Sequence, residues 1–225
     1  MNFDRVIREA TPLLWDGFLT TVYISVVSIV LGMIVGLVAC FMVISRWRAL
    51  KVMAGSYVWV IRGTPMIVQA FFFFFGINQL SMNTIGTQIF DREMAGIITV
   101  TLNAGAYFTE IFRAGIAAVP KGQTEAARSL GLSGSRTMAW VILPQALRIS
   151  LPPMVNQWII SIKDTAILSA IAVGELMNRM QVYAMSTFVF FESFIYVALW
   201  YLALLSALMI FAKKVEDWVK YDKNN

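Results

Sequence analysis

The sequence predicts an all-α integral membrane protein with about five transmembrane helices. Hydrophobic residues make up 59% of the 225 residues and charged residues only 14%, and the mean hydropathy is +0.71. A chain of this composition has too little polar surface to cover itself in water. Its first apolar run, from Gly17 to Ser45, contains no charged side chain and exceeds the ~20 residues that a helix needs to cross a bilayer.

Four more apolar segments follow, at about residues 53–78, 94–119, 146–173 and 190–212. An odd number of spans places the two termini on opposite sides of the membrane. The run 17–45 is too long for the short hydrophobic region of a signal peptide, so we expect it to remain in the mature protein. The sequence shows no internal repeat, which argues against the inverted-repeat design common among secondary transporters.

The distribution of Lys and Arg predicts the orientation. With the N-terminus outside, eleven of these residues lie in the cytoplasmic segments 46–52, 120–148 and 213–225, and only Arg5, Arg8, Arg92 and Arg179 lie outside. This asymmetry follows the positive-inside rule and explains the net charge of +5 without nucleic acid. We therefore expect an extracytoplasmic segment 1–16, a membrane domain 17–212 and a basic cytoplasmic tail 213–225.

The residue types that commonly carry catalysis are scarce. The chain has no histidine and a single cysteine, Cys40, which lies within the first apolar run. It also lacks a GxxxxGK[ST] phosphate-binding loop, so ATP is not expected to bind here. We therefore predict no catalytic residue, no metal site and no cofactor bound by this chain.

The polar stretch 121–144 separates the third and fourth predicted spans on the cytoplasmic side. Thr124 is a candidate N-cap, and Gly131 occupies the position at which a glycine ends a short helix. Ser133 can cap a second helix, which we expect to run until Pro144 disturbs it. Two short helices with a bend between them are therefore predicted.

This stretch also carries a family signature. Glu125-Ala126-Ala127, three residues, Gly131, nine residues, Val141, one residue and Leu143-Pro144 resemble the EAA motif of ABC importer permeases, with Val141 where isoleucine is usual. The resemblance implies the type I ABC importer transmembrane fold, with coupling helices that dock on a cytoplasmic ATPase. The residues assigned to ATPase coupling are Glu125, Ala126, Ala127, Arg128, Gly131, Leu132 and Arg136. An amphipathic loop helix lying on the membrane surface is the alternative.

Further stretches are similar to the polar amino acid uptake subfamily of these permeases. They are Arg62-Gly63-Thr64-Pro65, the run from Asn103 to Tyr107 with Glu110, Asn156-Gln157-Trp158 and Lys163-Asp164-Thr165. The resemblance implies a permease subunit in a bacterial inner or plasma membrane that takes up a polar or charged amino acid. Its implied partners are a second permease subunit, identical or paralogous, an extracytoplasmic amino-acid-binding protein and ATPase subunits that use ATP and Mg²⁺.

Polar and ionisable residues within the spans are the candidates for substrate contact, because such residues are costly in a membrane unless they face a bundle interior or an aqueous path. The candidates are Asp164, Lys163, Asn103, Tyr107, Glu110, Gln157 and Ser161. Lys163 and Asp164 diverge by about 100° on a helix and do not face each other, whereas Glu110 can pair with Arg113. Structural pairing is therefore an alternative for the charged candidates. Arg62 and Pro65 are assigned to gating or packing.

Two other functions were weighed. An ion-coupled secondary transporter of amino acids would be expected to carry coupling carboxylates and repeat symmetry. A membrane-embedded enzyme would be expected to carry a cluster of His, Asp or Glu at acid–base or metal-ligand spacing. The few intramembrane charges and the EAA stretch favour the ABC permease over both.

Overall fold

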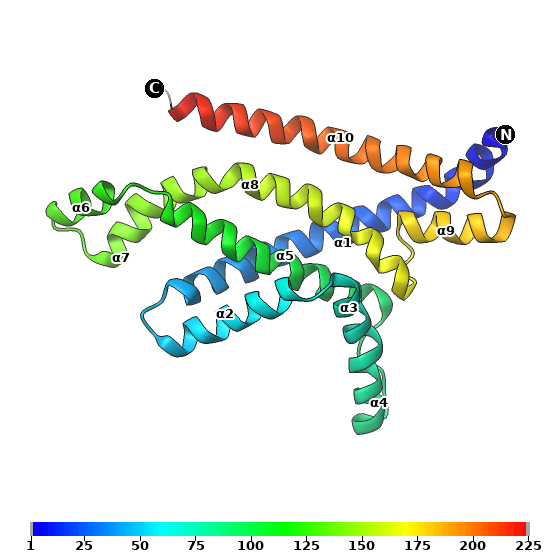
Figure 1. Cartoon of the computed structure of the whole chain (residues 1–225), viewed down its shortest axis with the longest axis horizontal. Helices are drawn as coiled ribbons and strands as arrows, with labels where there is room; N and C mark the ends of the chain where they lie inside the picture. The colour runs from blue at the N-terminus through cyan, green and yellow to red at the C-terminus, as the bar shows by residue number, and fades with distance from the viewer. Residues whose placement is uncertain (1, 224–225) are drawn as a thin grey trace.

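A computed structural model describes residues 2–223 of the chain, and these residues are almost entirely helical (Figure 1). The α-helices are α1 (Phe3–Ile44), α2 (Arg48–Gly63), α3 (Met66–Phe71), α4 (Asn78–Ile85), α5 (Arg92–Ala117), α6 (Lys121–Ser129), α7 (Gly134–Thr137), α8 (Leu143–Asp164), α9 (Leu176–Thr187) and α10 (Phe190–Lys223). Two π-helical segments, η1 (Phe72–Ile77) and η2 (Met138–Ile142), and a 3₁₀ segment, η3 (Thr165–Ile171), join some of them. Among residues 2–223 no strand is present, as the sequence predicts.

Three helical stretches of the described chain are long and apolar enough to cross a membrane: Phe3–Ile44, Gly134–Ile171 and Phe190–Val219. A fourth results if the pair Arg48–Gly63 and Met66–Ile85, bent by 107°, counts as one broken span. The 26 residues of α5 would extend about 39 Å, but its polar residues keep it out of this count. The all-α membrane class is confirmed, whereas the predicted number of five spans is not.

The second predicted span, 53–78, is not a single straight helix. Thr64, the residue before Pro65, is extended (φ −119°, ψ 143°), as steric contact with a proline ring requires. Gln69 stabilises this break, because its Nε2 donates to the oxygens of Ile61 in the last turn of α2 (2.8 Å) and of Thr64 directly after it (3.1 Å). The chain bends by 107° at this point. As a result α3 packs against α5, with Met66 and Ala70 in the core, while α4 extends away from the bundle (Figure 1).

The bundle is organised around α1 and α5, which make the most extensive contact in the molecule. Small residues allow this approach: a Cβ built on Gly36 would lie 2.5 Å from the Cβ of Phe108. Close approach through small residues is the usual way in which transmembrane helices pack. Against the other side of α5 lies α8, while α9 and α10 pack on the N-terminal half of α1, where the core includes Leu14 and Met180.

The two ends of the chain lie at opposite ends of the bundle (Figure 1). Near the N-terminus, the backbone N–H of Asn2 donates to Glu192 at the start of α10 (2.8 Å). Near the C-terminus, Trp218 of α10 lines a pocket with Pro120, directly before α6. The helix α1 begins at Phe3, so no break in the helix separates residues 3–16 from the apolar run that follows.

Candidate functional site

The polar stretch between α5 and α8 forms a helical loop at one end of the bundle (Figure 1). Its first helix, α6, begins at Lys121 with Pro120 as the N-cap residue. The prediction that Thr124 caps this helix is therefore wrong, since Thr124 lies inside it. The physical reason is that α6 extends back to Pro120, whose carbonyl accepts the N–H of Gln123 (3.0 Å).

The end of α6 confirms the role predicted for Gly131. This glycine has φ +81°, a left-handed conformation that is strained for residues with a Cβ. The N–H of Gly131 donates to the oxygen of Arg128 (3.0 Å), and the N–H of Leu132 donates to the oxygen of Ala127 (3.1 Å). These two bonds form a Schellman motif, which ends α6 and turns the chain toward α7.

The second helix starts as predicted, because the Ser133 side chain accepts the N–H of Arg136 (3.4 Å). The helix does not end at Pro144, where the sequence predicts a disturbance, because helical structure continues through Pro144 into α8. The helix instead widens to π geometry over Met138–Ile142, directly before the proline. A widened turn of this kind accommodates local disruption of the i to i−4 hydrogen bonds.

The surface of α6 and α7 is mostly unoccupied by the rest of the chain. Glu125, Ala126 and Arg128 are exposed, while Ala127 is the buried residue of α6. The exposed Arg136 lies over the ring of Trp140 (5.7 Å). The side chain of Leu130, which was not among the predicted residues, is 84% exposed.

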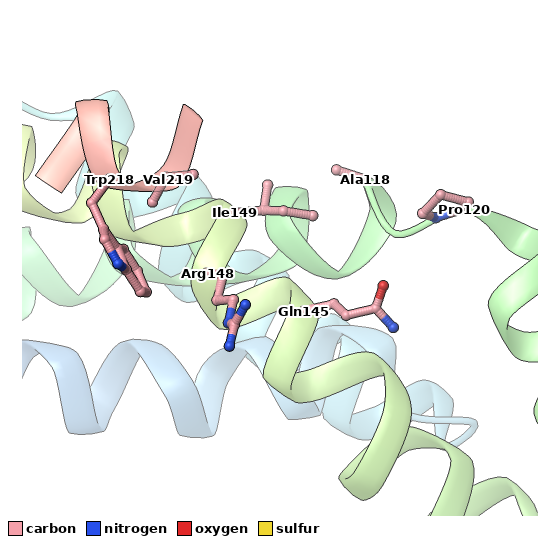
Figure 2. A pocket seen from close by; sticks show the side chains of 7 residues that line it. All are labelled: Ala118, Pro120, Gln145, Arg148, Ile149, Trp218 and Val219. Atoms are coloured by element: carbon pink, nitrogen blue, oxygen red, sulfur yellow. The ribbon is translucent and has the colours of Figure 1, made fainter. Parts of the chain in front are cut away.

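A pocket of about 550 Å³ lies at the base of this loop, between the end of α5, the start of α8 and the end of α10 (Figure 2). Arg148 of α8 lies over the ring of Trp218 of α10 (5.8 Å). The Nε2 of Gln145 donates to the oxygen of Val141 (2.8 Å) and to Oε1 of Gln123 in α6 (3.4 Å). A side-chain contact therefore links α6 to α8.

A second cleft of about 540 Å³ lies between α5 and α8. One face of α5 lines it with Tyr107, Glu110 and Ala114, and one face of α8 lines it with Ser150, Pro153 and Gln157. These positions are three, four or seven residues apart, so each set lies on one side of its helix. The cleft also includes Arg62 from the end of α2 and Asn156 from α8.

The charged groups of this cleft have defined neighbours. The guanidinium of Arg62 lies 5.1 Å from the centre of the Tyr107 ring, within range of a cation–π contact. The Glu110 carboxylate accepts from Arg113 Nη2 at 2.6 Å, the i, i+3 pair expected from the sequence. A positive and a negative group therefore line one cleft.

The remaining predicted substrate residues lie elsewhere. The buried Asn103 donates to Gln69 Oε1 (3.5 Å) and so contacts the break between α2 and α3. The buried Ser161 accepts from Gln157 Nε2 (3.3 Å), one turn beyond the cleft. Lys163 is exposed and Asp164 is partly buried at the end of α8, and neither lines the cleft. Lys163 and Asp164 do not form an ion pair with each other.

The cleft also contains a residue that the sequence analysis missed. Ser150 is buried, and its hydroxyl donates to the oxygen of Ile111 (3.4 Å) where α8 crosses α5. A Cβ built on Gly115 would lie 2.0 Å from Ser150 Oγ and 2.8 Å from the oxygen of Ala146. The spacing of Ser150 from Pro153 and Gln157 was the available signal, since all three fall on one helical face. No group of three or more His, Cys, Asp or Glu placed to hold a metal occurs among the described residues.

The fold, the exposed loop helices and the lined cleft define a class: a multi-pass membrane permease. Residues 28–221 match the family described as the binding-protein-dependent transport system inner membrane component. The chain belongs to this family. It is thus an inner-membrane transport subunit rather than an enzyme, and the predicted resemblance to ABC importer permeases is confirmed.

Curated relatives extend over almost the full length of the chain. It is 39% identical over 222 residues to the glutamine transport system permease protein GlnP of Escherichia coli K12, covering 98% of this chain and 99% of that protein. It is 37% identical over 220 residues to the arginine transport system permease protein ArtQ of Bacillus subtilis 168, covering 98% of each. Both relatives are named as transport permeases.

Solved structures support the same fold. A crystal structure of an amino acid ABC transporter with histidines superposes with a TM-score of 0.86 at 32% identity, covering 98% of this chain and 99% of that chain. A structure of the MetNI methionine ABC transporter superposes with a TM-score of 0.77, covering 93% of this chain and 97% of that one, at 19% identity. At this lower identity the second likeness concerns the fold alone. The predicted type I importer fold is therefore confirmed.

Proposed function

We propose that this chain is the permease subunit of an ATP-driven importer of a polar or charged amino acid. The named substrates of the full-length relatives, glutamine and arginine, support this substrate class. The observation that carries the proposal is the cleft between α5 and α8, because it presents both Arg62 and Glu110. A free amino acid carries one negative and one positive group at neutral pH, and both must be matched when they leave water.

In this proposal the Arg62 guanidinium binds the substrate carboxylate and the Glu110 carboxylate binds the substrate ammonium. Charge-assisted hydrogen bonds of this kind are stronger than those between neutral groups. Gln157 and Asn156 supply neutral hydrogen bonds to the remainder of the substrate. The cleft volume of about 540 Å³ lies within the usual range of small-molecule sites. Before substrate arrives, Arg113 neutralises Glu110 across their 2.6 Å ion pair.

The loop helices α6 and α7 dock on a cytoplasmic ATPase, which binds ATP and Mg²⁺. The exposed Glu125, Arg128 and Leu130 provide charged and apolar contacts for that partner. Motion of α6 reaches the substrate cleft because Gln145 of α8 contacts Gln123 of α6, and α8 forms one wall of the cleft. A second permease subunit and an extracytoplasmic binding protein complete the importer.

The proposed orientation places the N-terminus and α9 outside and the α6–α7 loop and the end of α10 in the cytoplasm. The opposite placement of these features along the bundle (Figure 1) supports it, as does the excess of Lys and Arg in the segments assigned to the cytoplasm. The segment 1–16 then lies on the extracytoplasmic side, and 213–225 forms the cytoplasmic tail.

The proposal is tested by uptake of labelled glutamine and arginine into vesicles that contain the complete transporter. Uptake should require ATP on the side of the vesicle membrane that carries the ATPase. It should persist when sodium and proton gradients are dissipated. Glu110→Gln and Arg62→Gln should each lower uptake at least tenfold at subsaturating substrate, while the conservative Arg62→Lys retains more activity than Arg62→Gln. Uptake that depends on an ion gradient and does not require ATP would instead identify a secondary transporter.

A further inference from the structure

A polar recess of about 450 Å³ lies at the end of the bundle opposite the α6–α7 loop. Its lining includes Thr20 of α1, Glu93 at the start of α5 and Gly174 in the turn before α9. Two arginines line this recess: Arg92, which is the first residue of α5, and Arg179 of α9. In the proposed orientation this recess opens on the extracytoplasmic side.

These two arginines differ from the other cations of the extracytoplasmic side. The Nε of Arg5 contacts Glu9 at 3.1 Å, and Arg8 donates to the oxygen of Asp4 (3.2 Å), so both are engaged within α1. Within the part of the chain that the structure describes, the side chains of Arg92 and Arg179 form no hydrogen bond, ion pair or ring contact. Both are exposed.

The Arg179 side chain is held in place by its own chain. A Cβ built on Gly17 of α1 would lie 3.0 Å from Arg179 Cγ, and one built on Gly174 would lie 3.2 Å from its Nη2. The stem therefore packs on one glycine and the guanidinium lies against another. A charged group that is already positioned loses less conformational entropy when a partner binds.

The acidic groups around the recess do not neutralise it. Glu175 adjoins Gly174 but is fully buried, and its carboxylate accepts from the N–H groups of Met177 (2.8 Å) and Asn178 (2.7 Å) and from the Tyr201 hydroxyl (2.8 Å). Glu93 is the acidic side chain that lines the recess, opposite two arginines. Asp91, next to Arg92, is engaged as the N-cap of α5, where its carboxylate accepts the N–H of Met94 (2.7 Å). Among the charged residues that line the recess itself, the arginines outnumber the carboxylates by one.

Positive charge at this end also opposes the proposed orientation of the chain, because Lys and Arg favour the cytoplasmic side of the membrane. Two exposed cations converging on one recess therefore indicate a partner with negative charge. Exposed arginines bind a free small carboxylate weakly in water. They act more effectively at the rim of a protein interface, where charge complementarity accelerates association and fixes register.

We propose that this recess receives an acidic side chain, Asp or Glu, from the extracytoplasmic binding protein, with Arg92 and Arg179 as its contacts. The inference rests on the proposed function, since it requires an importer with such a partner. The recess is then a docking site separate from the cleft between α5 and α8. It also fixes which face of this subunit the binding protein covers.

The test uses the complete transporter in nanodiscs and measures ATPase activity against the concentration of the binding protein. Arg92→Gln and Arg179→Gln should each raise the half-saturating concentration about three- to fivefold and weaken its dependence on salt, while the maximal rate is retained. The double variant should show a larger shift. Arg5→Gln is the matched control, because Arg5 is an outer arginine already paired within α1, and it should change the value less than twofold.

The outcomes separate this inference from the proposed function. A double variant that assembles normally and keeps the wild-type half-saturating concentration would overturn the docking site alone. A lower maximal rate with an unchanged half-saturating concentration would also overturn it, since that result indicates contact with the transported amino acid. If the binding protein fails to stimulate even the wild-type transporter, the proposed function itself is wrong, and the docking site with it.

Discussion

Two glycines, one within α6 and one just after its end, allow the α6–α7 loop to be perturbed in opposite directions. Gly131 has φ +81° and Gly122 lies in the first turn of the helix, and a Cβ built on either would meet nothing within 4 Å. Alanine therefore changes only the backbone preference at both positions. At Gly131 it should destabilise the end of α6 by about 1 kcal/mol, whereas at Gly122 it should stabilise the helix by roughly 0.5 kcal/mol.

The difference of about 1.5 kcal/mol corresponds to roughly a tenfold difference in the local opening equilibrium of α6. Hydrogen exchange of a peptide covering residues 121–132 measures it directly in the assembled transporter. Gly131→Ala should exchange faster than wild type and Gly122→Ala more slowly. Gly131→Asn should be milder than Gly131→Ala, because asparagine tolerates the left-handed conformation.

Function should follow the same order if the end of α6 sets the docking geometry. Gly131→Ala should lower the amount of amino acid taken up per ATP hydrolysed, and Gly122→Ala should leave that ratio near wild type. Equal exchange rates in the two alanine variants, or faster exchange in Gly122→Ala, would refute the conformational reasoning. Faster exchange in Gly131→Ala with an unchanged transport ratio would refute the link to coupling.

Three further changes probe other contacts. Gly115→Ala should destabilise the protein by about 1–3 kcal/mol, because the alanine Cβ would lie 2.8 Å from the Ala146 carbonyl oxygen and 2.0 Å from the Ser150 hydroxyl. Thermal unfolding measures this effect, and an unfolding midpoint equal to that of wild type would contradict it. Glu125→Lys should leave the subunit inserted but lower stimulated ATPase activity and uptake about fivefold or more, whereas unchanged values would remove Glu125 from the docking surface. Asp164→Asn should weaken uptake without loss of assembly, and unchanged uptake kinetics would rule out a substrate role.

Much of the α6–α7 loop could be predicted because its structure is determined by residues close together in the sequence. The left-handed conformation of Gly131 and the Ser133 cap each depend on residues within a few positions in the sequence. The ion pair between Glu110 and Arg113 is local in the same sense. The error at Thr124 arose because a cap residue was available there, while the helix in fact begins after Pro120.

The cleft between α5 and α8 could be predicted only in part, because it depends on which helices meet. Tyr107, Glu110 and Gln157 were identified from polarity and family resemblance, and they line the cleft. Ser150 shares a helical face with Pro153 and Gln157, but that spacing alone does not reveal the contact that Ser150 makes with α5. Likewise, the polarity of Asn103 was evident from the sequence, but its contact with Gln69 depends on the break between α2 and α3.

The number of spans was the weakest prediction for a related reason. Apolarity alone treats 53–78 as one continuous segment, whereas Pro65 breaks it and Gln69 stabilises the break. The predicted segment 94–119 corresponds to α5, which packs along α1, and its polar residues keep it out of the helices that are apolar enough to cross a membrane. Polarity in a bundle reports contact with protein as well as contact with water.

The opposite placement of the two chain ends has a practical consequence for building single-chain versions of the importer. The end of α10 lies beside the base of α6, with Trp218 and Pro120 lining one pocket, so a short linker from the C-terminus would deliver a fused ATPase directly to the docking surface proposed for it. The start of α1 packs beside α9 at the other end, near the arginine recess. In the proposed orientation a tethered binding protein therefore belongs on the N-terminus, and exchanging the two fusions would require each linker to cross the membrane.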